Sequence, residues 1–355
     1  MAYKSKSFNI SLLSEENVKK YILPEYNLED STISQIKFKN TDKQRAVYKV
    51  SHNDKNYCLK KVYFKEEELL FVYSSMEWLY RHNINVPRIL PNKNNGRFVN
   101  LNNMLFILTP WILGEKCDYD KKEHIFYSME NLSKMHNCAE KFIPIKGGYR
   151  KEKKDNIYLS YEKHLNQMLK CYNYAFKYQD KFSNTFINNF DLNLLLAKTS
   201  VKIASTINPD NLSRCLCHLD YVNKNIIIDD TSNIWVIDFD KCAKDFRVHD
   251  ISYFLRRILR RSSTNWNANL TIELLDTYNK LNPLNFDEYK YILSYLSFPQ
   301  KFWKISRDYY KNITKCNKKS FQKILNKSIQ DTEKQIKFSY ILGKYIEDKF
   351  KKPEY

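Results

Sequence analysis

The sequence predicts an α+β fold with two lobes, a small mainly antiparallel-sheet lobe in residues 1–110 and a large mainly helical lobe in residues 111–355. Short runs of strand composition separated by polar turns predict the first lobe. Apolar residues at helical spacing predict the second, which a hairpin near residues 215–240 interrupts. A chain of 355 residues also exceeds the usual size of one domain, so two lobes are expected.

The small lobe is expected to begin with an amphipathic helix within residues 11–28, entered at Ser14 and ended near Pro24. A second helix is predicted over residues 66–81, where apolar side chains recur at helical spacing. Two further strands are expected before Pro110. The first three strands are predicted at residues 33–38, 46–51 and 56–63.

The large lobe is expected to consist of helices around the hairpin. An aromatic stripe along residues 153–180 follows the helical period and therefore indicates packing rather than a stacking platform. Gly147 and Gly148 are interpreted as a flexible break before the helical segment 153–206. Helices are predicted at residues 121–138, 153–180, 184–206, 250–262, 271–281, 286–312 and 319–351.

Positive charge is the most unusual bulk property of the chain. Lys and Arg number 59 against 40 Asp and Glu, for a formal net charge of +19. The basic residues are dispersed and no zinc-finger or RNA-recognition motif accompanies them, so a solvated surface is expected first and nonspecific adhesion to anionic partners second. No specific nucleic acid is predicted. No apolar stretch is long enough to span a membrane and no signal-like segment follows the start, which predicts cytoplasmic synthesis.

The eight cysteines have no disulfide-framework spacing for so long a chain. Cys215, Cys217 and His218 are candidates for zinc because thiolates and imidazole are zinc ligands. On a strand, however, alternation would place the two cysteines on one face and His218 on the other. The pattern therefore favours buried cysteines over a metal site.

A kinase-type motif carries the chemistry of the chain. It begins at His218, continues through Asp220 and Asn225, and ends at Asp238 after an apolar run. Phosphoryl transfer needs a carboxylate to orient and deprotonate the acceptor hydroxyl, and oxygen ligands to hold Mg²⁺ against nucleotide phosphates. Asp220 is the candidate catalytic base, and Asn225 and Asp238 are the candidate metal ligands. His218 is expected to fix the shape of the loop.

The hairpin predicts how two of these residues meet. Two apolar runs, at residues 226–228 and 234–237, flank a turn-rich segment. Asn225 enters the first run and Asp238 leaves the second, so antiparallel pairing places them at the same edge. Asp and Asn are also common turn residues that bond their own backbone. The hairpin and the leading His218 together favour the phosphoryl-transfer interpretation.

Lys60 is the candidate for binding the phosphates of a nucleotide. It lies two residues after Cys58 on a predicted strand and so shares its face, whereas Lys61 points the other way. In kinase-like sites a helix carboxylate orients such a lysine, and Glu67 and Glu68 are equal candidates for this role. Both are also suited to the first turn of a helix, where negative charge is favourable.

The expected nucleotide loop contains no glycine, and the whole chain has only five. A Walker-type phosphate loop is therefore not indicated. Arg45 or Lys43 is a candidate phosphate contact, with solvent exposure as the alternative for each. Asp240, two residues beyond Asp238, is a candidate either for a second metal or for a turn.

These segments resemble the aminoglycoside phosphotransferase and choline kinase superfamily, and within it the CotS-type spore coat proteins. The likeness covers most of the chain, and segment 298–303 is similar to the coat subgroup in particular. The resemblance implies a bilobal protein kinase-like fold that uses ATP and Mg²⁺. It also implies that adenine rests against a hinge strand at Thr109 and Trp111, and that Asp250 steadies the catalytic loop. For Asp250 a helix cap is the alternative.

The expected function is therefore ATP- and Mg²⁺-dependent phosphoryl transfer to an unknown hydroxyl acceptor, either a small molecule or a protein side chain. The resemblance places the protein in the spore coat, with other coat proteins as partners. A catalytically inactive coat component with the same fold is the alternative, because function belongs to the site rather than to the fold. A nucleic-acid-binding module ranks last.

Overall fold

The computed structural model describes residues 12–39, 45–152 and 156–351, and it divides the chain into two compact units. The first unit comprises Met1–Cys117, Cys138–Glu152 and Asn223–Ala243. The second comprises Asp118–Asn137, Lys153–Val222 and Lys244–Tyr355. The first unit thus includes two segments from beyond the predicted boundary at residue 110, and one of them is the predicted hairpin.

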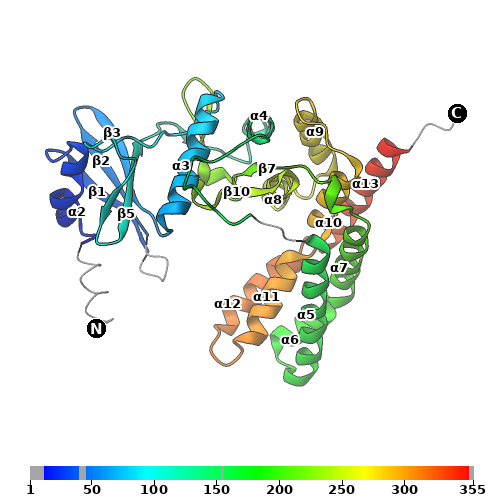
Figure 1. Cartoon of the computed structure of the whole chain (residues 1–355). Coiled ribbons are helices and arrows are strands. Elements are labelled where there is room, and N and C mark those ends of the chain that lie inside the picture. Colours follow the sequence, from blue (N-terminus) through cyan, green and yellow to red (C-terminus); the bar gives the residue numbers. More distant parts are fainter. Residues whose placement is uncertain (1–11, 40–44, 153–155, 352–355) are drawn as a thin grey trace. The chain divides into compact units, whose positions relative to one another are not determined.

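The first unit is built on a five-stranded antiparallel sheet with strand order β1-β2-β3-β5-β4 (Figure 1). The three predicted strands are present, each within two residues of its expected ends. The turn after β1 lies outside the described residues. The strands are β1 (Thr32–Lys39), β2 (Arg45–His52), β3 (Lys55–Lys61), β4 (Val99–Leu101) and β5 (Met104–Pro110).

Short helical elements cover the apolar side of this sheet. Helix α2 (Glu15–Tyr21) begins where expected, because the Ser14 side chain accepts a hydrogen bond from the Asn17 amide at 3.3 Å. A 3-10 turn, η1 (Leu23–Tyr26), follows. The Tyr26 hydroxyl donates to the Phe106 carbonyl of β5, at 3.1 Å. Fully buried side chains of α2, β2, β3 and β5 complete this core, among them Val18, Tyr48, Leu59 and Phe106.

Helix α3 (Glu66–Arg81) has the predicted bounds, and the predicted hairpin is also present. Strands β8 (Ile226–Ile228) and β9 (Ile234–Val236) pair antiparallel, with Ile226 opposite Val236. The short strand β6 (Glu115–Lys116) pairs with β8 and completes a three-stranded sheet. Gly114 makes this pairing possible: its φ is +136°, and a Cβ there would lie 2.3 Å from the Ile228 carbonyl oxygen.

The second unit is mainly helical, and in Figure 1 its helices run from green through orange to red. A two-stranded sheet of β7 (Arg214–Cys217) and β10 (Ala243–Phe246) lies beside helix α8. The helices are α4 (Lys122–Ala139), α5 (Ile157–Tyr178), α6 (Lys181–Asn188), α7 (Phe190–Ser205), α8 (Arg247–Leu259), α9 (Ala268–Asn279), α10 (Phe286–Ser297), α11 (Gln300–Lys311), α12 (Lys318–Ile329) and α13 (Thr332–Phe350). The small antiparallel sheet and the larger helical part form the predicted kinase-like fold.

Three predicted helices were wrong, because each is two helices. The expected helix 286–312 breaks at Phe298 and Pro299, where proline lacks an amide donor and keeps the preceding residue extended. The expected helix 184–206 breaks at Asn189, which ends α6 and begins α7. The expected helix 319–351 breaks at Gln330 and Asp331. Across the described ranges, no helix is both long and apolar enough to cross a bilayer.

Candidate active site

The open end of the β8–β9 hairpin brings together the two predicted metal ligands. The Ile237 amide donates to the Asn225 carbonyl at 2.9 Å, so the two strand ends lie side by side. Asn225 is buried at the end of the short turn Asn223–Asn225. Asp238 adopts a left-handed conformation with φ 66°, which turns the chain sharply into Phe239–Lys241. Because the Asp238 side chain keeps 28% of its exposure, it remains accessible to a ligand.

Lys60 of strand β3 contacts the carboxylates at this open end of the hairpin. Its Nζ lies 2.6 Å from Asp238 Oδ1 and 2.6 Å from Asp240 Oδ1. Burial alone would lower the pKa of Lys60, but the negative charges of Asp240 and Asp238 outweigh it and raise that pKa. The ammonium is therefore permanently charged and is held by two carboxylates.

Asp240 is the more deeply buried of the two carboxylates, with 5% of its side chain exposed. Its Oδ2 atom has no hydrogen-bond partner among the described residues, and Arg45 Nη1 lies 3.8 Å from it. Arg150 secures the backbone here, because its Nη1 donates to the carbonyls of Asp240 and Cys242 at 2.9 and 2.8 Å. A carboxylate oxygen without a partner suits a cation, so Asp240 belongs beside Asn225 and Asp238 as a candidate ligand.

The expected pairing of Lys60 with a glutamate of helix α3 stays a prediction. Neither Glu67 nor Glu68 contacts Lys60 in this structure, because the two aspartates hold its ammonium. Glu68 instead lies 3.5 Å from Arg150 Nε. Glu67 is exposed, and its backbone carbonyl accepts a hydrogen bond from the Tyr149 amide at 3.0 Å.

The predicted adenine-binding residues lie on the strand beside Lys60. Thr109 of β5 is opposite Cys58 of β3, and the Trp111 amide donates to the Asn56 carbonyl at 2.9 Å. Thr109 is buried, and the Lys49 ammonium lies 5.5 Å from the centre of the Trp111 ring. Thr109 therefore lies on the strand next to that of Lys60 and Trp111 follows directly after this strand, and their role toward adenine stays a prediction.

The predicted catalytic loop belongs to the second unit, where Asp250 of α8 holds it. The Asp250 carboxylate accepts hydrogen bonds from the His218 and Leu219 amides at 2.6 and 2.8 Å. Leu219 has φ +58°, a conformation that costs energy for a branched side chain and that the two bonds keep in place. The Asp220 amide in turn donates to His218 Nδ1 at 3.2 Å. Asp250 makes no cap for α8, whose N-cap residue Phe246 carries no side-chain bond.

A buried histidine supports the same carboxylate. His136 Nε2 lies 3.4 Å from Asp250 Oδ2, and its Nδ1 lies 2.9 Å from the Tyr278 hydroxyl. Cys215 and Cys217 are buried beside it with their sulfurs 3.8 Å apart, on one face of β7 as alternation predicts. Burial raises the pKa of Cys217. Because both nitrogens of His136 already have partners, this cluster is a structural support for the loop.

The structure thus forms two parts of the predicted site, one in each unit. Lys60, Asn225 and Asp238 lie together in the first, and His218, Asp220 and Asp250 lie together in the second. The convergence of Asp220 with the metal ligands stays a prediction. Sequence reasoning missed the roles of Arg150 and His136. Arg150 follows the Gly147-Gly148 break, and this position was the one available signal for it.

Comparison with known proteins identifies a family for most of the chain. The family model described as the phosphotransferase enzyme family matches residues 40–284. Spore coat protein S of Bacillus subtilis is 21% identical over 309 residues, which cover 83% of this chain and 85% of that protein.

Solved structures of phosphotransferases are similar in fold. An aminoglycoside phosphotransferase from Alicyclobacillus acidocaldarius superposes with a TM-score of 0.79 at 17% identity, covering 93% of this chain and 96% of that one. Spectinomycin phosphotransferase in complex with ADP and its antibiotic superposes with a TM-score of 0.64 at 16% identity, covering 92% and 98%. At such identities the likeness concerns the fold.

Proposed function

This chain belongs to the phosphotransferase enzyme family, and we propose that it transfers a phosphoryl group from Mg²⁺–ATP to a hydroxyl group of an acceptor in the spore coat. One observation carries the proposal: Lys60 lies between Asp238 and Asp240 at the open end of the hairpin that begins at Asn225. A lysine and several oxygen ligands at one point are what phosphate and magnesium together require.

Asn225, Asp238 and Asp240 are the proposed ligands for magnesium. The unpartnered Oδ2 of Asp240 and the exposed part of Asp238 fit a cation of this kind. Bound magnesium would neutralise charge on the phosphate oxygens. Lys60 would hold the phosphates as a fixed positive charge. Thr109, on the neighbouring strand β5, and Trp111 after it would contact the adenine.

Asp220 is the proposed base of the acceptor hydroxyl. It would orient the hydroxyl and take up its proton as the bond to phosphorus forms. Asp250 acts on Asp220 indirectly, because it fixes the His218 and Leu219 amides that precede the carboxylate. His218 continues this support by accepting a hydrogen bond from the Asp220 amide.

The positive charge of the protein narrows the chemical class of the acceptor. A net charge of +19 disfavours a polycationic antibiotic at long range. Asp120, one of the few acidic residues after the hinge, is already paired with Arg261, which lowers the pKa of Asp120 to about 2. A neutral or anionic hydroxyl compound, or a hydroxyl side chain of a coat protein, fits better than an aminoglycoside.

Nucleotide binding by matched variants tests this function. Purified wild-type protein should bind ATP only in the presence of Mg²⁺ and so gain thermal stability. Asp238→Asn should lose this gain, whereas Asp230→Asn at the exposed tip of the same hairpin should keep it. Asp220→Asn should bind the nucleotide but lose phosphoryl transfer to spore coat extracts by roughly 10² to 10⁴-fold.

The competing function is that of an inactive coat component, which the similarity to spore coat protein S favours. It predicts no nucleotide binding by the wild type, together with normal coat assembly by both Asp220→Asn and Asp238→Asn. This outcome would overturn the phosphotransferase proposal and keep the association with the coat.

A further inference from the structure

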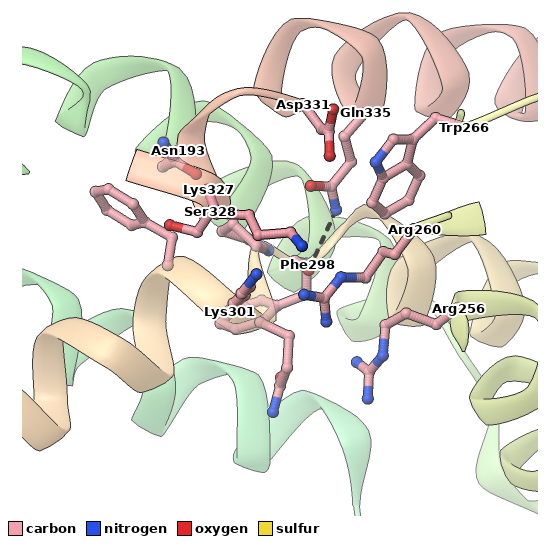
Figure 2. A pocket seen from close by; sticks show the side chains of 13 residues that line it. Asn193, Arg256, Arg260, Trp266, Phe298, Lys301, Lys327, Ser328, Asp331 and Gln335 are labelled. Carbon is pink, nitrogen blue, oxygen red and sulfur yellow. Dashed lines mark hydrogen bonds between the residues drawn. The ribbon is translucent and has the colours of Figure 1, made fainter. Parts of the chain in front are cut away.

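A second concentration of charge lies among helices of the second unit, apart from every residue assigned above. Four basic residues line one small hollow there, and Asp331 is the acidic residue in its lining (Figure 2). Arg256 and Arg260 come from the end of α8, Lys301 from the first turn of α11, and Lys327 from the end of α12. We propose that this hollow, the basic pocket, binds the phosphate group of a small anionic ligand.

The positive charges are close enough to disturb one another. Removal from water, together with Arg260 and Lys327, lowers the pKa of Lys301 to about 8. Arg260, Lys301 and Lys327 form no ion pair among the described residues, and Asp331 is itself 3.6 Å from Lys334. The cluster is therefore under-compensated, which is the electrostatic condition that an anion relieves.

Two buried donors in the pocket have no acceptor. Arg256 is held by Tyr295, whose hydroxyl accepts from Nη2 at 2.7 Å and whose ring lies 4.1 Å below the guanidinium. This leaves Nη1 of Arg256 buried without a hydrogen-bond partner among the described residues. The indole Nε1 of Trp266, a residue that is 7% exposed, is likewise buried without a hydrogen-bond partner among the described residues. Because buried donors are almost always satisfied, both indicate a missing acceptor.

The backbone adds further donors. Residues Gln300–Phe302 begin α11 and line the pocket, and a helix of 12 residues carries a partial positive charge at this end. The Gln300 amide donates to the Phe298 carbonyl at 2.7 Å, so the Lys301 and Phe302 amides are the donors at this end. In Figure 2 the break before this turn is held by Gln335, which donates to the Phe298 carbonyl at 3.3 Å. The helix break that the sequence analysis missed is thus what brings amide groups to the basic side chains.

The size of the pocket selects the ligand class. Its volume is about 60 Å³, room for a few water molecules and so for one tetrahedral oxyanion. Guanidinium groups bind phosphate oxygens through paired donors, and the lysines add charge at the rim. A phosphate monoester therefore fits better than a polyanion.

Titration with inorganic phosphate and with glycerol phosphate, at constant ionic strength and pH 7, tests the proposal in the full-length protein. Both should raise the melting temperature in a saturable manner, because they bind the native state. A larger effect of the ester than of inorganic phosphate would identify a phosphorylated metabolite as the ligand, and equal effects would identify phosphate itself. No saturable effect of either anion would overturn the proposal.

Matched variants separate the pocket from general screening. Lys301→Glu should abolish the saturable shift, and Lys327→Gln should weaken the apparent affinity about threefold, as expected for loss of one rim charge. Lys319→Gln, which makes the same charge change at the exposed start of α12, should leave it unchanged. Equal shifts in Lys301→Glu and in wild type would mean that the anion binds elsewhere. Mg²⁺–ATP binding should persist in Lys301→Glu, so failure here is distinguishable from failure of the proposed phosphotransferase site.

Discussion

The two charged clusters of this protein contrast in how they are balanced. In the first unit one ammonium, that of Lys60, meets the carboxylates of Asp238 and Asp240 at 2.6 Å. In the second unit four basic side chains share the basic pocket with one carboxylate. The first cluster is compensated from within, so its cation stays charged. The second lacks compensation, and burial together with the charges of Arg260 and Lys327 lowers the pKa of Lys301. Charge balance therefore distinguishes the two clusters: the first has more carboxylates than cations and suits a further cation, and the second has more cations than carboxylates and suits an anion.

Removing the cation from the compensated cluster should have the largest effect. Lys60→Met leaves two partly buried carboxylates facing each other, so we expect a loss of about 3 kcal/mol in the free energy of unfolding. Urea denaturation measures it. Lys55→Met at the exposed beginning of the same strand should change stability by less than about 0.5 kcal/mol. Equal losses in the two variants would mean that the contacts of Lys60 do not matter.

The backbone pairing of β6 with β8, next to the compensated cluster, should be nearly as sensitive to substitution. Gly114→Ala puts a methyl group 2.3 Å from the Ile228 carbonyl oxygen in a backbone with φ +136°. We expect about 2 kcal/mol of destabilisation from strain and from loss of the β6–β8 pairing. Gly343→Ala on α13, where the nearest atom is 3.6 Å away, should instead stabilise slightly. Thermal melting of both variants would show whether the two glycines differ in this way.

Removing a positive charge from the basic pocket should stabilise the protein, whereas removing the charge of Lys60 should destabilise it. Without anions, Lys301→Met removes a partly buried charge that also repels Arg260 and Lys327, and it should stabilise the protein by about 1 kcal/mol at pH 7. Because the pKa of Lys301 is lowered in the folded state, its charge opposes folding below pH 8. This penalty disappears above the unfolded-state pKa. The gain should therefore vanish toward pH 10, and a gain that persists there would point to packing instead.

The smallest expected effect is the pH dependence of anion binding. Sulfate keeps its charge between pH 7 and 9, whereas Lys301, with a pKa of about 8, loses most of its proton over this interval. The apparent affinity of the protein for sulfate should therefore fall about fivefold as the pH rises from 7 to 9. Lys301→Met should remove this dependence, and an unaltered pH profile in that variant would assign the titration to another group.

Local pattern was enough to predict the sheet, the hairpin and helix α3. Alternation and helical spacing are properties of neighbouring residues, and Asn225 and Asp238 were placed at one edge by pairing rules alone. The helix break at Pro299 also had a local signal, but those at Asn189 and Asp331 had none as strong. There the tertiary packing of two helices decided the break rather than propensity.

The partners of charged side chains could not be predicted in the same way. Glu67 and Glu68 were reasonable partners for Lys60, yet Asp240, 180 residues away, takes that place. The contact between Lys60 and Asp240 depends on how the hairpin packs against β3. Local sequence patterns do not predict such packing. The basic pocket was unpredictable for the same reason, because its four cations come from three helices that are distant in sequence.

Helix α8 joins two features of the second unit. Asp250 in its first turn accepts hydrogen bonds from the loop before Asp220, and Arg256 in its last turn lines the basic pocket. Six residues of helix separate them, a rigid rod of about 9 Å. The carboxylate that holds the loop before Asp220 and one guanidinium of the basic pocket are thus fixed to a single stiff helix, so any tilt of α8 moves both of them together.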